Sequence, residues 1–313
     1  MKSILYHHLN ITNKDFEIEY IQNLQNENFF LLGIEVSDTD LSNCFHINID
    51  PQHEHHNSKL TSIEYVFNYH EDILNIIRNF DKLFISTLKP DVDSIGSISI
   101  LIMLLKNNFH INGDLVLRLK AIAKSDRHGR HNWDNHNKDY FRFPNYNIYG
   151  LPSGLAYMTS DYKITINQKI KNMISYLKTG TFETLETYNK AVYDNLKKSN
   201  KSTYVKTIVP KKLVFISSVH RGAVAYGYKF ASTVIAKNEN FAFGSGSTKL
   251  YGKKVTIAQY EDNKFINLTE LKNKLNKLEP GWGGSSVILG SPQTNPTKLK
   301  DSTIIDLTKK YLY

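Results

Sequence analysis

The chain has 313 residues, of which 41% are hydrophobic and 22% are charged, so it is long enough to form two globular domains with apolar cores. Cys44 is its one cysteine, which excludes an intrachain disulfide and suits a reducing compartment. The N-terminus lacks the apolar stretch of a signal peptide, and the longest strongly apolar run, residues 98–105, is too short to cross a membrane. The sequence therefore predicts a cytoplasmic protein with no membrane partner.

The net charge of +9 is concentrated in one part of the chain. Between Asn195 and Asn238 there are nine lysine and arginine residues and no acidic residue, so the remainder, with 39 − 9 = 30 basic and 30 acidic residues, is neutral. A local excess of positive charge attracts a polyanion. A solvated basic linker has the same composition, so the charge alone leaves both interpretations open.

The first 50 residues show patterns typical of strands. Residues 16–20 and 45–49 alternate between apolar and polar side chains, and residues 29–34 form an apolar run that suits a buried strand. Residues 60–80 then have the apolar spacing of a helix, and residues 115–123 fit a strand or a short helix. Strands that alternate with helices predict an α/β fold with a largely parallel sheet flanked by helices.

The candidate strand over residues 45–49 ends in Asp50, and His53 lies just beyond it. A carboxylate at a strand end with an imidazole nearby is a plausible metal site, so Asp50 and His53 are candidate ligands. A polar loop that faces water is the alternative, and it is our interpretation of His55 and His56.

Residues 82–105 carry the most informative pattern. An apolar strand at 83–86 enters a turn that contains Asp91 and Asp93, and a long apolar helix leaves from about Ile95. In an α/β sheet the carboxyl ends of the strands form the ligand crevice. Carboxylate oxygens gathered there suit Mn²⁺ or Mg²⁺. The two aspartates would equally serve to cap the helix and complement its dipole.

The segment after residue 123 is rich in basic and imidazole side chains. Asp126 is a further candidate metal ligand there, and His128 and His131 are candidates for binding metal or a substrate phosphate. A loop of this composition that simply meets solvent is the alternative.

The rest of the chain is predicted to form a connection between domains, followed by a second α/β segment. Residues 132–154 predict a long irregular connection whose aromatic rings pack in a core or stack on a base. Residues 164–196 have helical spacing and predict a bridge between domains. Beyond it, strands are predicted over 213–216, 232–236, 241–243, 253–260 and 287–289, and helices over 223–230, 268–278 and 304–312.

A glycine-rich loop follows the helix over residues 268–278. It contains Gly281, Gly283, Gly284 and Ser285, and glycines allow backbone N–H groups to approach a phosphate closely. Glycines also make tight turns, so this loop alone is a weak signal.

Taken together, the two halves resemble the DHH phosphoesterase superfamily. The turn Thr87-Leu88-Lys89-Pro90-Asp91-Val92-Asp93-Ser94-Ile95-Gly96-Ser97 is similar to the first family motif, His-x-Asn-Pro-Asp-x-Asp-Ser-x-Gly-Ser. The loop from Gly281 to Ser285, with Gly290 after a strand, is similar to the family's C-terminal glycine motif. The resemblance implies a two-metal α/β domain over residues 1–150, a helical linker over 151–205, and a smaller substrate-binding α/β domain over 206–313.

Three departures from the family pattern stand out. Thr87 replaces a metal-binding histidine, Ser285 replaces a histidine that would touch the substrate phosphate, and no Asp-His-His occurs. Asp50 with His53 would stand in for the last motif, although it precedes the first one. With fewer nitrogen ligands, metal affinity should fall or the preference should move toward Mg²⁺.

The sequence thus predicts a divalent-metal phosphoesterase that acts on a nucleotide or a short oligonucleotide. Its metal ligands would be Asp50, His53, Asp91, Asp93 and Asp126, with His128 as a further catalytic residue. His220 and Arg221 would clamp the substrate phosphate together with the glycine-rich loop. Two alternatives stay open: a nucleotide or nucleic-acid binding protein without catalysis, and a structural protein. A homodimer is compatible with each of these.

Overall fold

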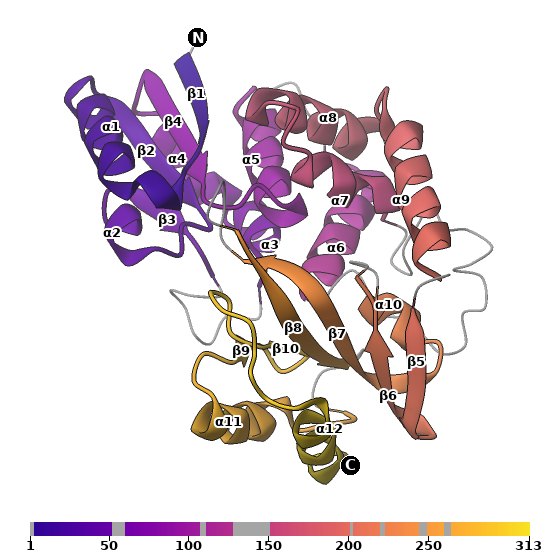
Figure 1. The fold of residues 1–313 in the computed structure, drawn as a ribbon. Coiled ribbons are helices and arrows are strands. Elements are labelled where there is room, and N and C mark those ends of the chain that lie inside the picture. Colours follow the sequence, from indigo (N-terminus) through magenta and orange to yellow (C-terminus); the bar gives the residue numbers. More distant parts are fainter. Residues whose placement is uncertain are drawn as a thin grey trace. The chain divides into compact units, whose positions relative to one another are not determined.

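A computed structural model describes residues 3–51, 60–106, 111–127, 151–200, 203–219, 223–243, 249–259 and 264–313. The chain divides into two compact units. Of the described residues, the first unit holds those up to 127 and those from 151 to 189, and the second holds those from 190 onward. Each unit contains its own sheet, which makes the protein an α/β protein (Figure 1). No helix in the described ranges has the length and apolar character needed to cross a membrane.

The first unit is built on a four-stranded sheet in which every strand pair is parallel. In spatial order the strands are β1 (Ser3–His8), β4 (Lys82–Thr87), β2 (Phe29–Ile34) and β3 (Ile47–Ile49). All six residues of β2 are buried, which explains why this strand has a continuous apolar sequence instead of an alternating one. The predicted parallel sheet is confirmed.

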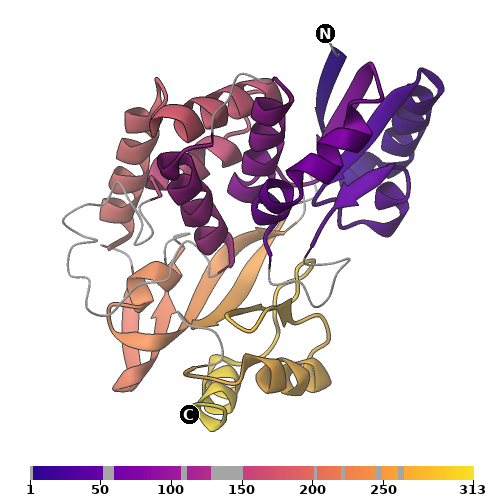
Figure 2. The ribbon, with the colours of Figure 1, turned by 180° about the vertical axis from the view of Figure 1, so that it is seen from behind.

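Helices cover both faces of this sheet, as the two opposite views show (Figures 1 and 2). On one face, α1 (Lys14–Asn26) and α2 (Thr39–Ser42) pack over β2 and β4 around Leu31 and Phe84. On the other face lie α3 (Ser62–Asn68), α4 (His70–Ile77) and α5 (Val92–Leu105). The helix α5 is buried from Val92 to Met103, so it is the central helix of the unit.

Three more helices complete the first unit by packing against α5 or its neighbours. They are α6 (Gly113–Arg127), α7 (Ser153–Ser160) and α8 (Ile166–Thr179), and a short 3-10 turn, η1 (Ile11–Asn13), precedes α1. The segment that was predicted as a helical linker is indeed helical in α7, α8 and α9 (Leu185–Asn200). However, α7 and α8 form part of the first unit, because their apolar faces bury against α5.

Several local predictions need correction. Residues 16–20 lie in α1, not in a strand, because Glu17, Ile21 and Leu24 are buried at helical spacing. Residues 115–123 belong to the longer helix α6, so they add no strand to the sheet. The single helix predicted over 60–80 is two helices, α3 and α4, that meet at Tyr69.

The second unit contains a mixed six-stranded sheet. Its strands, in spatial order, are β5 (Tyr204–Val209), β6 (Lys211–Ser217), β7 (Ala231–Phe243), β8 (Leu250–Gln259), β10 (Ile288–Gly290) and β9 (Gly283–Gly284). Only β6 and β7 are parallel, and the other pairs are antiparallel. The strands predicted over 232–236 and 241–243 form the one strand β7, whose register shifts between Asn238 and Phe241.

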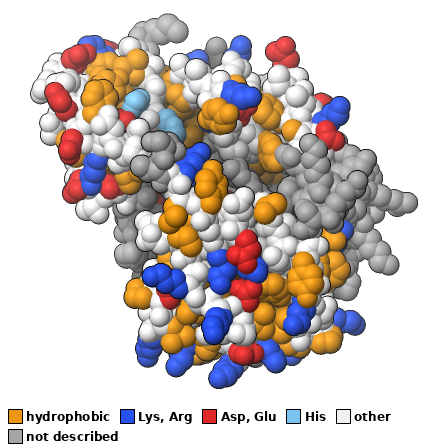
Figure 3. Space-filling model, viewed as in Figure 1, with side chains coloured by type: hydrophobic (Ala, Val, Ile, Leu, Met, Phe, Trp, Pro, Cys, Tyr) orange, Lys and Arg blue, Asp and Glu red, His pale blue; other side chains and the backbone are white. Residues whose placement is uncertain are grey.

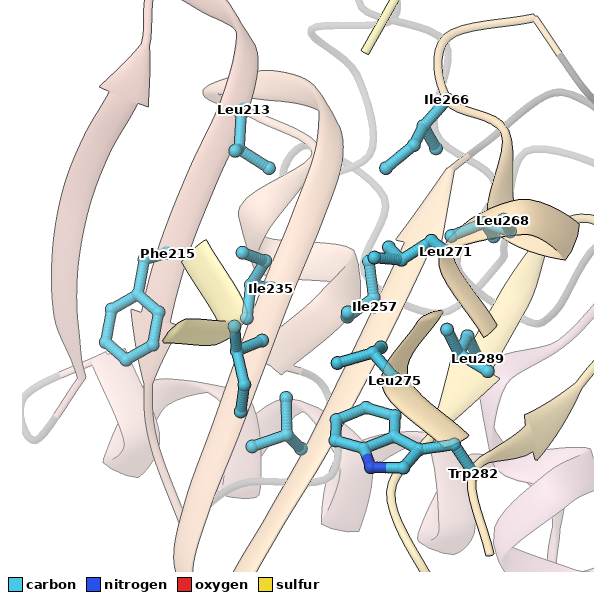
Figure 4. Close-up of a cluster of buried hydrophobic side chains, with 12 residues drawn as sticks. Leu213, Phe215, Ile235, Ile257, Ile266, Leu268, Leu271, Leu275, Trp282 and Leu289 are labelled. Atoms are coloured by element: carbon cyan, nitrogen blue, oxygen red, sulfur yellow. The ribbon is translucent and has the colours of Figure 1, made fainter. Parts of the chain in front are cut away.

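Helices also cover this second sheet. The short helix α10 (Ala223–Gly227) packs on one face of β6 and β7. On the other face, α11 (Leu268–Leu278) and α12 (Asp301–Lys310) bury an apolar core against the sheet (Figure 4). In this core Leu271, Leu275 and Trp282 pack against Ile257 and Leu289.

The basic residues of this unit do not form a uniform positive surface among the described residues. Lys237 pairs with Glu239 at 2.6 Å and with Asp301 at 2.7 Å, and Lys253 lies 3.3 Å from the same aspartate. On the face shown in Figure 3, lysine and arginine side chains are interspersed with acidic and hydrophobic ones. The charge excess of the sequence is therefore partly neutralised locally.

Replacing the N-cap of α11 should destabilise the second unit modestly. The Asn267 side chain accepts a hydrogen bond from the Glu270 N–H at 3.1 Å, and its loss in Asn267→Ala should cost about 1 kcal/mol. The control is Asn273→Ala, at an exposed position inside the same helix, where alanine should be neutral or slightly stabilising. Urea unfolding measures both, and equal midpoints for the two variants would contradict the capping role.

Candidate functional site

The carboxyl ends of the four parallel strands lie at one edge of the first sheet. His8 ends β1 opposite Thr87, the last residue of β4, and Thr87 in turn lies opposite Ile34 of β2. Glu35 follows β2 and Asp50 follows β3, and the Glu35 N–H donates to the Ile49 carbonyl at 3.0 Å. Side chains with oxygen and nitrogen donors are thus gathered at the edge where open α/β sheets bind ligands.

The turn between β4 and α5 is held by its own side chains. The Thr87 hydroxyl accepts from the Lys89 N–H and donates to the Lys89 carbonyl, both at 3.3 Å. The Ser94 hydroxyl donates to the same carbonyl at 2.7 Å. Asp91 is the N-cap, and its Oδ1 accepts from the N–H groups of Asp93 and Ser94 at 3.1 Å. This cap starts α5 at Val92, three residues earlier than the predicted Ile95.

Asp93 has a different role from Asp91. Its side chain is only 1% exposed, and its oxygens accept from the N–H groups of Ser62 at 2.8 Å and Ile63 at 3.2 Å. These are the first two residues of α3, so Asp93 caps a second helix from a distance of about thirty residues in sequence. Both aspartates therefore cap helices, as the structural alternative proposed, but they cap different ones.

Glu35 is a site residue that the sequence reasoning missed. It has a positive φ of 56°, which is unusual for a residue other than glycine and is a form of strain often found at functional sites. Its Oε1 accepts from the Ser62 hydroxyl at 3.0 Å, and the N–H of the same serine donates to Asp93 Oδ2 at 2.8 Å, so Ser62 binds both carboxyl groups. The signal was present, because Glu35 follows a buried strand directly, as Asp50 does.

The carboxyl groups at this edge repel one another. Burial raises the pKa of Glu35 well above its usual range, and the charges of Asp93, Asp91 and Asp126 raise it further. Burial also raises the pKa of Asp93 well above its usual range, with added contributions from Asp126 and Asp91. Ionisation of either carboxyl group therefore opposes ionisation of the other.

Asp126 contributes to this repulsion from the last turn of α6. A negative charge is unfavourable at the C-terminal end of a helix, because the helix dipole is negative there. The sequence placed Asp126 after a strand or short helix, and the structure brings it into electrostatic contact with Asp93 and Glu35 from the end of a helix.

The donors at this edge have the chemistry that Mn²⁺ and Mg²⁺ prefer. All of the carboxylates are hard oxygen ligands, and a cation would relieve the repulsion that raises the two pKa values. Within the described residues, however, no group of three or more His, Cys, Asp or Glu side chains is arranged to hold a metal ion. The carboxylates of Asp91 and Asp93 accept hydrogen bonds from backbone N–H groups in this arrangement. The donor chemistry fits a divalent cation, and the side chains would have to turn to coordinate it.

The glycine-rich loop lies in the second unit and uses several of its amides internally. The N–H groups of Gly281 and Trp282 donate to Asn276 Oδ1 at 2.9 and 3.0 Å. The Ser285 N–H donates to the Ile288 carbonyl at 2.8 Å. Gly283 and Gly284 form β9 and are exposed. A phosphate bound by this loop would therefore lie against the surface of this short strand.

Five predicted site residues lie outside the described residues, namely His53, His128, His131, His220 and Arg221. No protein-family model matches this chain, and neither does any curated protein. The functional interpretation therefore depends on the site itself.

Proposed function

We propose that the carboxylates at the edge of the parallel sheet bind Mn²⁺ or Mg²⁺, and that the chain is a divergent DHH-type phosphoesterase. Its substrate would be a phosphodiester or phosphomonoester of a nucleotide or short oligonucleotide. The observation that carries the proposal is that Ser62 donates hydrogen bonds to both Glu35 and Asp93, and that burial and neighbouring carboxylates raise the pKa values of these two groups. Such a pair destabilises the fold unless a cation or a proton compensates its charge.

The residues at the edge divide into three roles. Glu35 and Asp93 would be the principal ligands, with Asp91, Asp126 and Asp50 around them. His8, opposite Thr87 in the register, would supply the nitrogen donor that Thr87 lacks. The Ser62 hydroxyl and the amides of α3 orient the two principal carboxyl groups through the hydrogen bonds already described.

When bound, a divalent cation lowers the pKa of a coordinated water and neutralises phosphoryl oxygens. The raised pKa values of Glu35 and Asp93 favour their protonated forms, so protons would be released when the cation binds and metal affinity should rise with pH. Asp91 keeps the start of α5 rigid through its cap, which holds Asp93 in place relative to Glu35.

Hydrolysis of a phosphoester panel by the purified protein tests the proposal. Nucleotides, dinucleotides and a chromogenic phosphodiester should be turned over with Mn²⁺ or Mg²⁺ and not with EDTA. Calorimetric titration of Mn²⁺ should at the same time release protons near neutral pH. No turnover of any panel member with either metal, together with no metal binding, would refute the proposal.

A second candidate is binding of a phosphate-containing small molecule or short nucleic acid without catalysis. It is favoured by the helix-capping hydrogen bonds of Asp91 and Asp93, which explain both residues without a metal. In that case nucleotide binding should weaken as salt is raised, need no metal and give no product. The same panel therefore separates the two functions.

A further inference from the structure

A small cavity lies beside β3 in the first unit. It has a volume of about 170 Å³ and lies between β3 and the helices α3 and α4. Tyr69 is 45% exposed and Ile76 is 44% exposed at its rim, so the cavity is accessible to solvent. Asp50 lines this cavity and also belongs to the carboxylate edge, whereas Glu35, Asp91, Asp93 and Asp126 do not line it.

The walls of the cavity are apolar and aromatic. Four isoleucine side chains line it from two directions, Ile47 and Ile49 from the strand and Ile73 and Ile76 from α4. Tyr65 and Tyr69 line it as well, with ring centroids 4.7 Å apart and planes inclined at 44°. Tyrosine rings attract cations over their faces, and the attraction is largest where water is excluded.

The charged residues of the lining all have the same sign. Asp50 and Asp72 contribute to it, and no lysine, arginine or histidine is among the described residues that line it. Asp50 is 3% exposed, whereas Asp72 is exposed on the surface of α4. An apolar cavity with tyrosine rings and two carboxylates favours a ligand with an alkyl chain and a positive charge.

The volume limits the size of the ligand. A cavity of about 170 Å³ lies below the range of about 300–1,000 Å³ that is typical of sites for drug-sized ligands, so it suits a ligand with few heavy atoms. Pockets for nucleotides or drug-sized molecules are typically several times larger. The cavity is therefore too small for the substrate of the proposed phosphoesterase.

We propose that this cavity binds a small aliphatic amine, such as a four-carbon diamine, in its ammonium form. The alkyl chain packs between the isoleucine side chains, an ammonium group lies against the tyrosine rings, and the carboxylates of Asp50 and Asp72 balance the charge. The proposal does not depend on the phosphoesterase activity. A ligand this small gives few contacts, so a Kd on the order of a millimolar is expected.

Saturation-transfer NMR with 1,4-diaminobutane, in EDTA so that no metal contributes, tests the proposal. The diamine should bind saturably, whereas 1,4-butanediol and butyrate, which have similar chains without the positive charge, should bind at least about fivefold more weakly. Binding of the diol or of butyrate as strong as that of the diamine would overturn the proposal.

Two variants localise the binding. Asp72→Asn removes the exposed carboxylate, and Tyr69→Leu removes one aromatic face, and each should raise the Kd about two- to fivefold. Glu71→Gln is the matched control, because Glu71 is an exposed acid on the same helix that does not line the cavity. Diamine binding that is unchanged in both variants, or equally weakened in the control, would place the amine elsewhere and overturn the proposal.

Discussion

Glu35→Gln should abolish metal-dependent hydrolysis and, without metal, should make the protein more stable than the wild type. Glutamine keeps the shape of the side chain and can still accept from the Ser62 hydroxyl. It removes the negative charge that a divalent cation needs, so activity should fall at least about a hundredfold. It also removes a carboxyl group whose ionisation in the folded state is opposed by burial and by three neighbouring aspartates.

The stability gain should depend on pH in a defined direction. The pKa of Glu35 is raised in the folded state, so between its unfolded value and its folded value the folded protein binds more protons than the unfolded one. The stability of the metal-free wild type therefore falls as pH rises from about 4.3 through the raised pKa. In Glu35→Gln this decline should be smaller, and the unfolding temperature above pH 7 should be several degrees higher than that of the wild type.

Asp15→Asn is the control for this experiment, since Asp15 is an exposed acid on α1. It should change neither hydrolysis nor the pH profile. Thermal unfolding in EDTA from pH 5 to pH 8, followed by circular dichroism, gives the stability, and the phosphoester panel gives the activity. If Glu35→Gln unfolds at a lower temperature than the wild type at pH 8, the hydrogen bonds of the Glu35 carboxyl group stabilise the fold by more than its repulsion from the aspartates destabilises it.

Gly284→Ala should be the most destabilising single substitution in the glycine-rich loop, at about 2–4 kcal/mol. Gly284 has a φ of +141°, which side chains rarely tolerate, and a Cβ there would lie 2.1 Å from the Ile288 carbonyl oxygen. To relieve this clash, β9 would have to move away from β10. The buried Trp282 directly precedes β9.

The neighbouring glycine provides a matched control for this prediction. A Cβ at Gly283 has no heavy atom within 4 Å, so Gly283→Ala should shift the urea midpoint only slightly. Tryptophan fluorescence follows both transitions, because Trp282 is 3% exposed in the folded protein. Equal midpoints for the two variants would contradict the steric account of this loop.

Patterns with a strong physical signal were read correctly from the sequence. The buried strands β2 and β4, the helix α11 and the parallel arrangement of the first sheet are all as predicted, because long apolar runs and regular apolar spacing have few alternative structures. Residues 16–20 were assigned incorrectly, since five alternating residues also fit one turn and a half of a helix. The burial of Ile21 and Leu24 against the sheet stabilises the helix over the strand in this segment.

The residue types of the candidate site could be predicted from the sequence, but the contacts between those residues could not. The sequence predicted acidic residues at the ends of strands, and the structure places Asp50 and Asp91 there, but the sequence does not show that Asp93 reaches across to the start of α3. Nor does it show that Glu35 meets Asp93, since nearly sixty residues separate them. Contacts of this kind depend on how the helices pack on the sheet, which no local pattern encodes.

The order of strands in the first sheet has a consequence for synthesis of the chain. The strand β4 pairs with both β1 and β2, so these two strands have no common partner until residue 87 has emerged. At about 5–20 residues per second, the 87 − 34 = 53 residues between the ends of β2 and β4 take about 3 to 10 seconds to translate. During that interval the edge of β2 that later pairs with β4 is unpaired, and a chaperone that shields extended hydrophobic segments would bind there.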